Sequence, residues 1–332
     1  MQYRAPVSTQ IAVCVVALLL ADTALARGPL AKAKPDRRGV AAGRPVDSSR
    51  YTFVEIPTPA NAVFAAAVEV NESRLITGVY DVVTPAGEYE EYTFVWDGKA
   101  PLKTIKAKGA AITSVPGLNA LGSRLYGNWG SDTQQTAGYY DLRSGEFTSF
   151  DPPYGKPLNL INRATDAGTM LGYSCDGTFF EPKDCVQWLS DGKHFDKLLL
   201  PEAPTKIPFY INNREDVVGF SLDAPPFLFS SWVYRRGVFT YAYPPLITPN
   251  ECMFRSISNS GLILGNGETD PNRFWQPFLY DGRSTTLLPE YASGGQTTYN
   301  GLNENGDLAG TFAFLADPQG NFRFIPLVAF RK

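Results

Sequence analysis

The stretch "ISNSGLILGNG" at residues 257–267 combines an apolar residue, a polar bend, two or three apolar residues and a glycine. The same phrase returns as "LNENGDLAGTF" at residues 302–312 and as "INNREDVVGFS" at residues 211–221. We interpret each phrase as two β-strands joined by a tight turn, in which Asn, like Gly, tolerates the left-handed backbone conformation. The apolar residues on either side of the turn then belong to the core of a sheet.

Three more divergent copies of the phrase begin at Val70, Leu118 and Ile161, which makes six in the chain. Each copy is followed by an irregular polar segment and then by an aromatic-rich stretch such as "VQWLSDG" or "QPFLYDG". Five of the aromatic stretches end in a turn that contains Gly, and Asp-Gly between apolar runs favours a type I′ hairpin. A short fourth stretch, such as "EFTSFDPP", ends at proline. The pattern therefore predicts units of four antiparallel strands.

Residues 51–332 divided among six units give 47 residues per unit, close to the roughly 40–50 residues of a propeller blade. A single sheet of this length cannot bury both of its faces, whereas six sheets packed radially can. We therefore predict an all-β fold, a six-bladed β-propeller of four-stranded antiparallel blades. An open β-solenoid is the alternative. The expected repeats lie near residues 51–110, 111–157, 158–204, 205–248, 249–294 and 295–332.

The two ends of this region complement one another. The sixth copy stops at "FRFIPLVAFRK" without its last turn and fourth strand. The stretch "YTFVEIPTP" at residues 51–59 has the aromatic residue, the alternation and the final proline of a fourth strand. We therefore predict that the N-terminal strand, Tyr51 to Ile56, closes the last blade, which would hide both free sheet edges.

The first 26 residues have the order of a secretory signal peptide. Arg4 is followed by an apolar run at residues 11–20 and by the small residues Ala24 and Ala26 at a cleavage site. A buried N-terminal helix is the alternative. Ten apolar residues are too few to cross a bilayer, which needs about 20. We expect residues 1–26 to be removed and the protein to be secreted or periplasmic, with no membrane span.

The charge changes sharply after the leader. Residues 27–50 carry a net charge of +5 and no hydrophobic period, which is typical of a flexible basic leader. Since the whole chain carries −3 and residues 1–26 are neutral, residues 51–332 carry −8. An acidic body argues against nucleic acid as a partner. The leader could contact anionic surfaces of the cell envelope, but a solvated tether is the favoured interpretation.

Three cysteines follow the expected cleavage site: Cys175, Cys185 and Cys252. Export to an oxidising compartment favours a disulfide. Cys175 and Cys185 lie in "SCDGTFFEPKDC", between two expected strands that a hairpin brings side by side, so we predict that they are bonded and that Cys252 is free. Because the chain has a single His, a Cys/His metal site is hard to build. We expect no metal and no other cofactor.

Two long stretches resemble the bacterial extracellular HAF-type repeats: "PFLYDGRSTTLLPEYASGGQTTYNGLNENGDLAGTF" and "YYDLRSGEFTSFDPPYGKPLNLINRATDAGTMLGYS". Those repeats carry His-Ala-Phe at the start of the aromatic strand and an Ile-Asn-x-x-Gly-x-x-x-Gly turn. The resemblance covers about residues 51–332 and is strongest from residue 139 onward. Gln276-Pro277-Phe278 stands where His-Ala-Phe would be, and no copy keeps the His. The resemblance implies a propeller-like architecture and supplies no catalytic residues.

The sequence contains no nucleophile elbow, zinc-protease, phosphate-loop or dinucleotide motif. The single histidine, His194, lies beside an expected hairpin turn, and we interpret it as an exposed turn residue rather than a general base. Glycan hydrolysis needs only two suitably placed acids. The loops offer many: Glu88, Glu90, Glu91, Asp132, Asp176, Glu181, Asp184, Asp223, Glu268 and Asp270.

Two functions therefore stand. The favoured one is an exported, monomeric propeller that binds an extracellular or envelope ligand, either a glycan or a protein, because no catalytic constellation is visible. The alternative is a carbohydrate-active enzyme, a glycoside hydrolase or lyase, that uses loop carboxylates on the same scaffold. The fold alone decides neither.

The expected ligand face is the one that carries the longer loops. The strand one-to-two bends and the three-to-four turns are short and lie on one face, so the longer two-to-three and blade-to-blade segments share the other. Variable loops on rigid strands are the usual arrangement for recognition. That these loops merely cap the blades is the alternative. The expected ligand-binding residues are Trp275, Arg255, Asn300, Tyr89, Phe179, Glu181, Asp132 and Asp270.

Overall fold

The computed structural model describes residues 48–99, 101–119, 121–179, 182–201, 205–222, 229–269, 275–316 and 322–332. The predicted signal peptide and most of the predicted leader lie outside these residues, and so do Glu181 and Asp270. In the described part, a 3-10 helix at Ser48–Arg50 is followed only by β-strands, which confirms the all-β prediction. No helix among these residues is long and apolar enough to cross a membrane.

The strands form antiparallel groups of four in chain order. The first three groups are β2 (Ala62–Val70), β3 (Ile76–Val83), β4 (Tyr89–Trp96) and β5 (Lys103–Ile105); β6 (Ile112–Leu118), β7 (Arg124–Gly130), β8 (Gln135–Asp141) and β9 (Phe147–Phe150); and β10 (Leu158–Ala164), β11 (Met170–Gly177), β12 (Pro182–Ser190) and β13 (Phe195–Lys197). Single parallel residue pairs, Glu91 with Ile112 and Gln135 with Leu158, link these groups into one 12-stranded sheet.

The other three groups are separate four-stranded sheets. They contain β14 (Thr205–Ile211), β15 (Val217–Leu222), β16 (Phe229–Arg235) and β17 (Val238–Tyr241); β18 (Cys252–Ile257), β19 (Ile263–Gly267), β20 (Gln276–Tyr280) and β21 (Thr285–Leu287); and β22 (Gly295–Leu302), β23 (Leu308–Leu315), β24 (Phe322–Arg331) and β1 (Tyr51–Glu55). In the last sheet the N-terminal strand β1 pairs with β24 over five residues.

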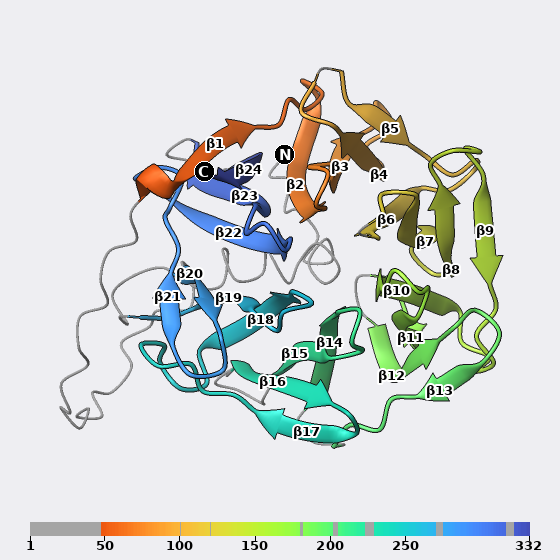
Figure 1. Ribbon diagram of the computed structural model, residues 1–332. Helices are drawn as coiled ribbons and strands as arrows, with labels where there is room; N and C mark the ends of the chain where they lie inside the picture. The colour runs from red at the N-terminus through yellow and green to blue at the C-terminus, as the bar shows by residue number, and fades with distance from the viewer. Residues whose placement is uncertain are drawn as a thin grey trace, which may run out of the picture.

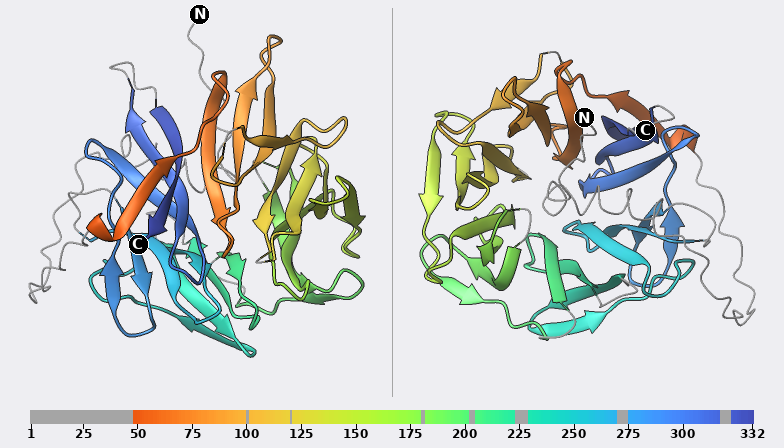
Figure 2. Two further views of the ribbon diagram at one scale, coloured as in Figure 1. Left: turned by 45° about the horizontal axis from the view of Figure 1, so that its top comes forward. Right: turned by 180° about the vertical axis from the view of Figure 1, so that it is seen from behind.

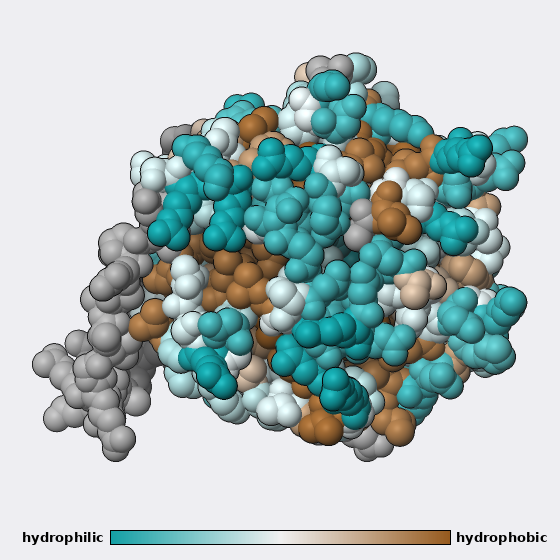
Figure 3. Space-filling model, in the orientation of Figure 1, coloured by the Kyte–Doolittle hydropathy of each residue, from teal (hydrophilic) through white to brown (hydrophobic). Residues whose placement is uncertain are grey.

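The groups are arranged around a central axis (Figure 1). The view from behind in Figure 2 shows the same arrangement, with the first strand of each group nearest the axis and the fourth farthest from it. The first and last groups touch, because β2 packs against β22, β23 and β24. Figure 3 shows that hydrophilic residues cover the centre of one face. The apolar residues lie mainly between neighbouring groups, where the core clusters are found.

In four of the groups a glycine in the second strand lies between a backbone oxygen of the first strand and an aromatic ring of the third: Gly78, Gly172, Gly219 and Gly265. A Cβ on Gly219 would lie 2.1 Å from the carbonyl oxygen of Ile207 and 2.5 Å from the ring of Trp232. Gly172 has the same relation to Leu160 and to the ring of Trp188. Both tryptophans are fully buried. The glycine of the repeat therefore makes room for the aromatic residue of the third strand, which explains why the two recur together.

The inner strands share an irregularity that the sequence pattern did not predict. The first strand of every group shifts register against the second at the same position, two to four residues before its end. Such bulges bend a strand and re-aim its side chains. The residue that follows the bulge is Glu69, Gly117, Arg163, Tyr210, Ser256 or Gly301.

The bends between first and second strands correct one prediction. The left-handed residue is not the Asn but the residue three positions later, such as Arg74 (φ 62°), Glu215 (φ 61°) or Gly306 (φ 82°). The Asn contributes its side chain instead: Asn303 Oδ1 accepts the backbone N–H of Asp307 at 2.8 Å. Thr165 and Ser258 take the same role through their hydroxyls. Hydrogen bonding, not backbone tolerance, is therefore why the bends begin with a polar residue.

The cysteine prediction is confirmed. Cys175 and Cys185 form a disulfide between β11 and β12, and Cys252 is free and buried. Burial raises the pKa of the Cys252 thiol to about 12, and the thiol lies 3.0 Å from the hydroxyl of Ser231. The Cys252 thiol is therefore held in its unreactive, protonated form.

Candidate functional site

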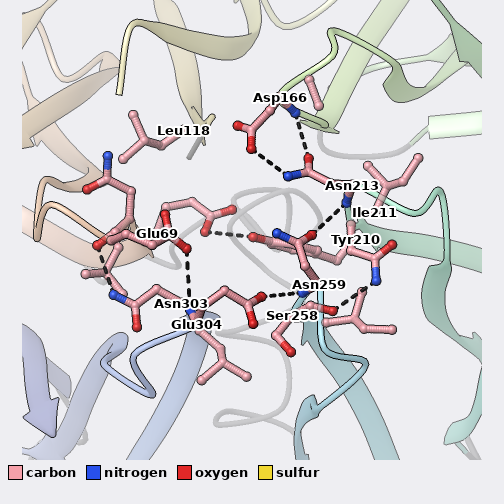
Figure 4. A pocket seen from close by; sticks show the side chains of 17 residues that line it. Glu69, Leu118, Asp166, Tyr210, Ile211, Asn213, Ser258, Asn259, Asn303 and Glu304 are labelled. Atoms are coloured by element: carbon pink, nitrogen blue, oxygen red, sulfur yellow. Dashed lines mark hydrogen bonds between the residues drawn. The ribbon is translucent and has the colours of Figure 1, made fainter. Parts of the chain in front are cut away.

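A pocket lies on the axis, at the face that carries the bends. It encloses about 440 Å³, part of it open to solvent, and 17 residues from all six groups line it. We call it the axial pocket. The close view in Figure 4 shows side chains from sheets on every side converging on one space, among them Glu69, Asp166, Tyr210, Asn259 and Glu304.

The floor of the axial pocket is a buried polar cluster from three different groups of strands. Glu69 of β2 forms an ion pair with Arg163 of β10, and Tyr210 of β14 donates its hydroxyl to Glu69 Oε2 at 3.2 Å. The guanidinium of Arg163 lies 5.2 Å from the centre of the Tyr210 ring. All three residues directly follow a bulge in an inner strand. The bulges therefore turn these side chains towards the axis, where they meet.

Burial controls the protonation of the floor. It raises the pKa of Glu69 to about 7, and Arg163 and Tyr210 oppose that shift. Burial and the nearby carboxylate also raise the pKa of Tyr210, so its hydroxyl stays protonated and can donate. A carboxyl group with a pKa near neutrality at the bottom of a pocket can take up or release a proton under physiological conditions.

The mouth of the axial pocket is held by a directional chain of hydrogen bonds between neighbouring bends, which we call the rim chain. The backbone N–H of Asp166 donates to Asn213 Oδ1 (2.7 Å), and that of Asn213 donates to Asn259 Oδ1 (2.8 Å). The N–H of Asn259 donates to Glu304 Oε1, and that of Glu304 to Glu72 Oε1 (3.4 Å). Each donor and acceptor is the second residue of its bend. The rim chain therefore fixes polar side chains around the pocket mouth before any ligand arrives.

Two further contacts join the last sheet to the first. Asn303 Nδ2 donates to the carbonyl of Asn71 at 2.9 Å, and Asn300 Nδ2 donates to that of Ala67 at 3.0 Å. The rim chain is described as far as Glu72. The next bend has Ala120 at the equivalent place, which has no side-chain acceptor and lies outside the described residues.

The residues expected to bind ligand are mostly buried. Phe179, Arg255, Trp275 and Asn300 are between 0% and 8% exposed. Trp275 packs edge-on against Phe229, and Arg255 lies with its guanidinium 5.0 Å from the centre of the Phe209 ring. Burial lowers the pKa of Arg255 to about 9. These four side chains are buried in this structure, and their role in binding stays a prediction.

The two other expected residues that the structure describes, Tyr89 and Asp132, are exposed. Tyr89, at the start of β4, is 40% exposed, and Asp132 lies in the loop between β7 and β8. Arg255 and Asn300 lie past the middle of their strands, at the bulges. His194 is exposed, with Nδ1 3.2 Å from Asp191 Oδ2. Among the described residues, the structure brings none of the expected ligand-binding residues into the axial pocket.

The sequence reasoning missed Glu69, Arg163 and Tyr210. A signal was present, because all three occupy the same place, two residues before the polar residue that opens the bend. Glu69 and Arg163 are also single charges within apolar strands, in "AAAVEV" and "LINRA". Charged residues are almost never fully buried unless they are paired. Comparing the six copies at this position would have shown a possible acid–base pair.

A second buried polar cluster lies between the first two groups of strands. Asp81 of β3 and Glu91 of β4 are directly opposite one another and only 4% and 5% exposed. Asp81 lies three residues after Gly78, the glycine of its second strand, just as Cys175 lies three residues after Gly172. The carboxyl pair therefore occupies, in the first group, the place of the Cys175–Cys185 disulfide in the third group. Burial raises the pKa of both carboxyl groups, that of Glu91 to about 7, and Glu91 raises that of Asp81 further; Lys106 opposes both shifts. Among the described residues, no group of three or more His, Cys, Asp and Glu could hold a metal ion.

We expect this carboxyl pair to make stability depend on pH. An acid whose pKa is raised in the folded state keeps its proton to a higher pH when the protein is folded than when it is unfolded. The contribution of Glu91 to the free energy of unfolding is therefore fully present below about pH 4.5 and is lost as the pH rises through about 7. Glu91→Gln removes a buried charge and should raise the free energy of unfolding at pH 8 by roughly 2–3 kcal/mol. At pH 4 the variant and the wild type should differ little. Urea unfolding at both pH values measures this.

The matched control for that experiment is Glu146→Gln, which makes the same chemical change at an exposed turn. It should leave the pH dependence unchanged. Equal stability of Glu91→Gln and wild type at pH 8 would show that the Glu91 carboxyl group is not desolvated as described.

No family model and no curated protein matches this chain, so the resemblance to HAF-type repeats stays a prediction. The solved structures that match include the β-propeller domain of the trilobed protease from Pyrococcus furiosus (11% identity, TM-score 0.46, 75% of this chain and 79% of that one). The structural neighbours of the present chain are β-propeller proteins.

Two other matches are TolB from Acinetobacter baumannii and an acylaminoacyl peptidase. TolB is 13% identical, with a TM-score of 0.46, over 82% of this chain and 65% of TolB. The peptidase is 12% identical, with a TM-score of 0.48, over 75% of this chain. The chain spans 43% of the length of the peptidase. At such identities the likeness concerns the fold alone.

Proposed function

We propose that the protein is a six-bladed β-propeller whose last blade is completed by β1, and that it serves as a binding module. Six groups of four strands, the five-residue pairing of β1 with β24, and the hydrogen bonds from Asn300 and Asn303 to the first group support the closed ring. In this interpretation the 12-stranded sheet is three blades, since only single residue pairs join its parts.

We further propose that the protein is exported, as a secreted or periplasmic monomer whose first 26 residues are removed. The disulfide supports this, because disulfides persist in oxidising compartments. The expected ligand is a glycan or a protein outside the cytoplasm.

The axial pocket is the observation that carries the binding function. Its floor is a buried Glu–Arg–Tyr group and its mouth is held by the rim chain, so polar groups are already in place around an open space. Preorganised polar groups bind without the entropic cost of ordering side chains. We therefore propose that a small polar ligand, or a polar end of a larger glycan, enters the axial pocket rather than the opposite, loop-bearing face.

One observation favours the alternative, a carbohydrate-active enzyme. Glu69 has a pKa of about 7 and faces a pocket whose mouth carries further carboxylates, and glycoside cleavage uses one protonated and one ionised acid. The ion pair with Arg163 weighs against it, because a guanidinium beside a carboxyl group favours the ionised form, which has no proton to donate.

Ligand-observed NMR and calorimetry with neutral, acidic and amino sugars test the proposal, with product analysis to detect cleavage. Tyr210→Phe deletes only the hydroxyl that donates to Glu69. It should weaken binding about three- to tenfold, which corresponds to the roughly 0.7–1.4 kcal/mol of a typical hydrogen bond. His194→Ala, an exposed position outside the pocket, should not change binding.

Other outcomes would decide against parts of the proposal. A ligand that ignores Tyr210→Phe but is lost in Tyr89→Ala or Asp132→Ala would place the site on the loop-bearing face. Product release that Glu69→Gln abolishes would establish the enzyme.

A further inference from the structure

Asp81 and Glu91 form a cross-strand pair of the closest kind. They lie directly opposite one another on β3 and β4. The backbone N–H of Glu91 donates to the carbonyl of Ala111 in the second group at 3.1 Å, and therefore not to β3. In such a non-hydrogen-bonded pair the Cα atoms lie about 4.5 Å apart and the side chains approach most closely. The Cys175–Cys185 disulfide, at the corresponding place in the third group, has a Cα–Cα distance of 4.2 Å.

Two groups from neighbouring elements act on this pair. Lys106, in the segment after β5, acts on both carboxyl groups, and Ser114 of β6 forms a hydrogen bond with Glu91. The Lys106 ammonium is bound to two backbone carbonyl oxygens, at 2.6 and 3.2 Å, and lies 3.7 Å from the carboxylate of Glu90. In the part of the chain that the structure describes, Asp81 Oδ1 and Glu91 Oε1 have no hydrogen-bond partner.

A shared proton satisfies this arrangement. Two ionised carboxylates side by side repel one another, and the repulsion is strongest where water is excluded. Asp81 and Glu91 are only 4% and 5% exposed. With one proton between them, one carboxyl group donates to the other in a charge-assisted O–H···O hydrogen bond, which is stronger than a hydrogen bond between neutral groups. That bond would join β3 to β4 through side chains, as the disulfide joins β11 to β12.

We propose that Asp81 and Glu91 act as a proton-operated clasp, which holds the loop-bearing end of the β3–β4 hairpin closed while they share a proton and releases it when the proton is lost. The clasp goes beyond the binding function proposed above and does not depend on it. The end that it controls contains the turn at residues 84–88 and the exposed pair Val83 and Tyr89. The first group thus has a reversible counterpart of the covalent link in the third group.

The direction of the switch follows from burial. Burial raises the pKa of Glu91 to about 7, from an ordinary value of about 4.5. The closed hairpin therefore keeps its proton to a higher pH than the open hairpin does. The contribution of the clasp is fully present below about pH 4.5 and is lost as the pH rises through about 7. Acid closes the hairpin and alkali releases it.

Hydrogen–deuterium exchange of the full chain tests the clasp, measured by mass spectrometry at about pH 5.5 and about pH 8 and corrected for intrinsic exchange rates. The segments of β3 and β4 around the pair should open about ten- to thirtyfold more often at the higher pH, which is the ratio expected for pKa values of about 4.5 when open and 7 when closed. The β11–β12 hairpin, which its disulfide holds, is the internal control and should keep its protection.

Three variants separate the clasp from general stability. The double variant Asp81→Asn, Glu91→Gln has no titratable group at the pair, so its opening should change less than about twofold between the two pH values. The double variant Asp81→Cys, Glu91→Cys should, once oxidised, stay closed at both, because so close a pair suits a disulfide. Glu88→Gln, at the exposed turn of the same hairpin, is the matched control and should keep the change seen in the wild type.

Equal protection of the β3–β4 hairpin at the two pH values in the wild type would overturn the proposal. A pH dependence that survives in the Asp81→Asn, Glu91→Gln variant would also overturn it, because the titrating group would then lie elsewhere. A loss of protection shared equally by all six groups of strands would do the same, because the proton would then control the whole fold and not this hairpin.

Discussion

Removing residues 27–59 should lower the melting temperature of the protein by about 10–20 °C, whereas removing residues 27–45 should leave it nearly unchanged. The longer deletion takes away β1, whose partner β24 then presents an unpaired edge. It also removes Tyr51 and Ile56, which are 8% and 3% exposed in the interfaces between sheets. Losing two such side chains costs on the order of 5 kcal/mol, and each kcal/mol shifts the melting temperature by about 2–4 °C.

Calorimetry of the two shortened chains measures this difference. If the chain without β1 does not fold, Ile56→Ala provides a milder change that should cost about 2–5 kcal/mol, with the exposed Thr52→Ala as its control. Identical melting of both shortened chains would mean that β1 does not complete the last blade.

Gly219→Ala should destabilise the protein by more than 4 kcal/mol. The added Cβ would lie 2.1 Å from a backbone oxygen of β14 and 2.5 Å from the buried Trp232 ring, and neither can move without separating the strands. Effects of this size arise only from severe overpacking or similar defects. The free energy of unfolding in urea measures it.

Gly237→Ala is the control for this substitution, because a Cβ there meets nothing within 4 Å. Its positive φ of 81° limits the cost to roughly 1–2 kcal/mol. Gly265→Ala should fall between the two, since its nearest backbone oxygen is 3.0 Å away. If Gly219→Ala and Gly237→Ala unfold alike, the close packing of first, second and third strands is absent.

The repeated phrase of the sequence was enough to predict strands, turns and the pairing of the chain ends. This works because alternation, Asp-Gly turns and prolines act locally, within a few residues. The disulfide was predictable for the same reason, since Cys175 and Cys185 are separated by one hairpin. The glycine and the aromatic residue recur together because a single contact needs both, as Gly219 and Trp232 show.

The role of the bend residues was not predictable from the phrase alone. Asn213 could be recognised as a turn residue, but its hydrogen bonds reach Asp166 and Asn259 in the two neighbouring groups. Such contacts depend on how the groups of strands are arranged relative to one another, and the sequence of a single bend does not specify that arrangement. The burial of Arg255 and Trp275 could not be predicted for the same reason, because they pack against Phe209 and Phe229, which belong to a different group of strands.

By itself the sequence therefore determined the all-β class, the four-strand unit and the covalent pairing of two cysteines, each of which follows from short-range order. Only the tertiary structure decided where polar groups meet. Glu69, Arg163 and Tyr210 lie 94 and 47 residues apart along the chain, and they form one group because a bulge in each inner strand turns them towards a common axis. The bulge depends on backbone pairing between strands, which many side chains permit and none of these three specifies.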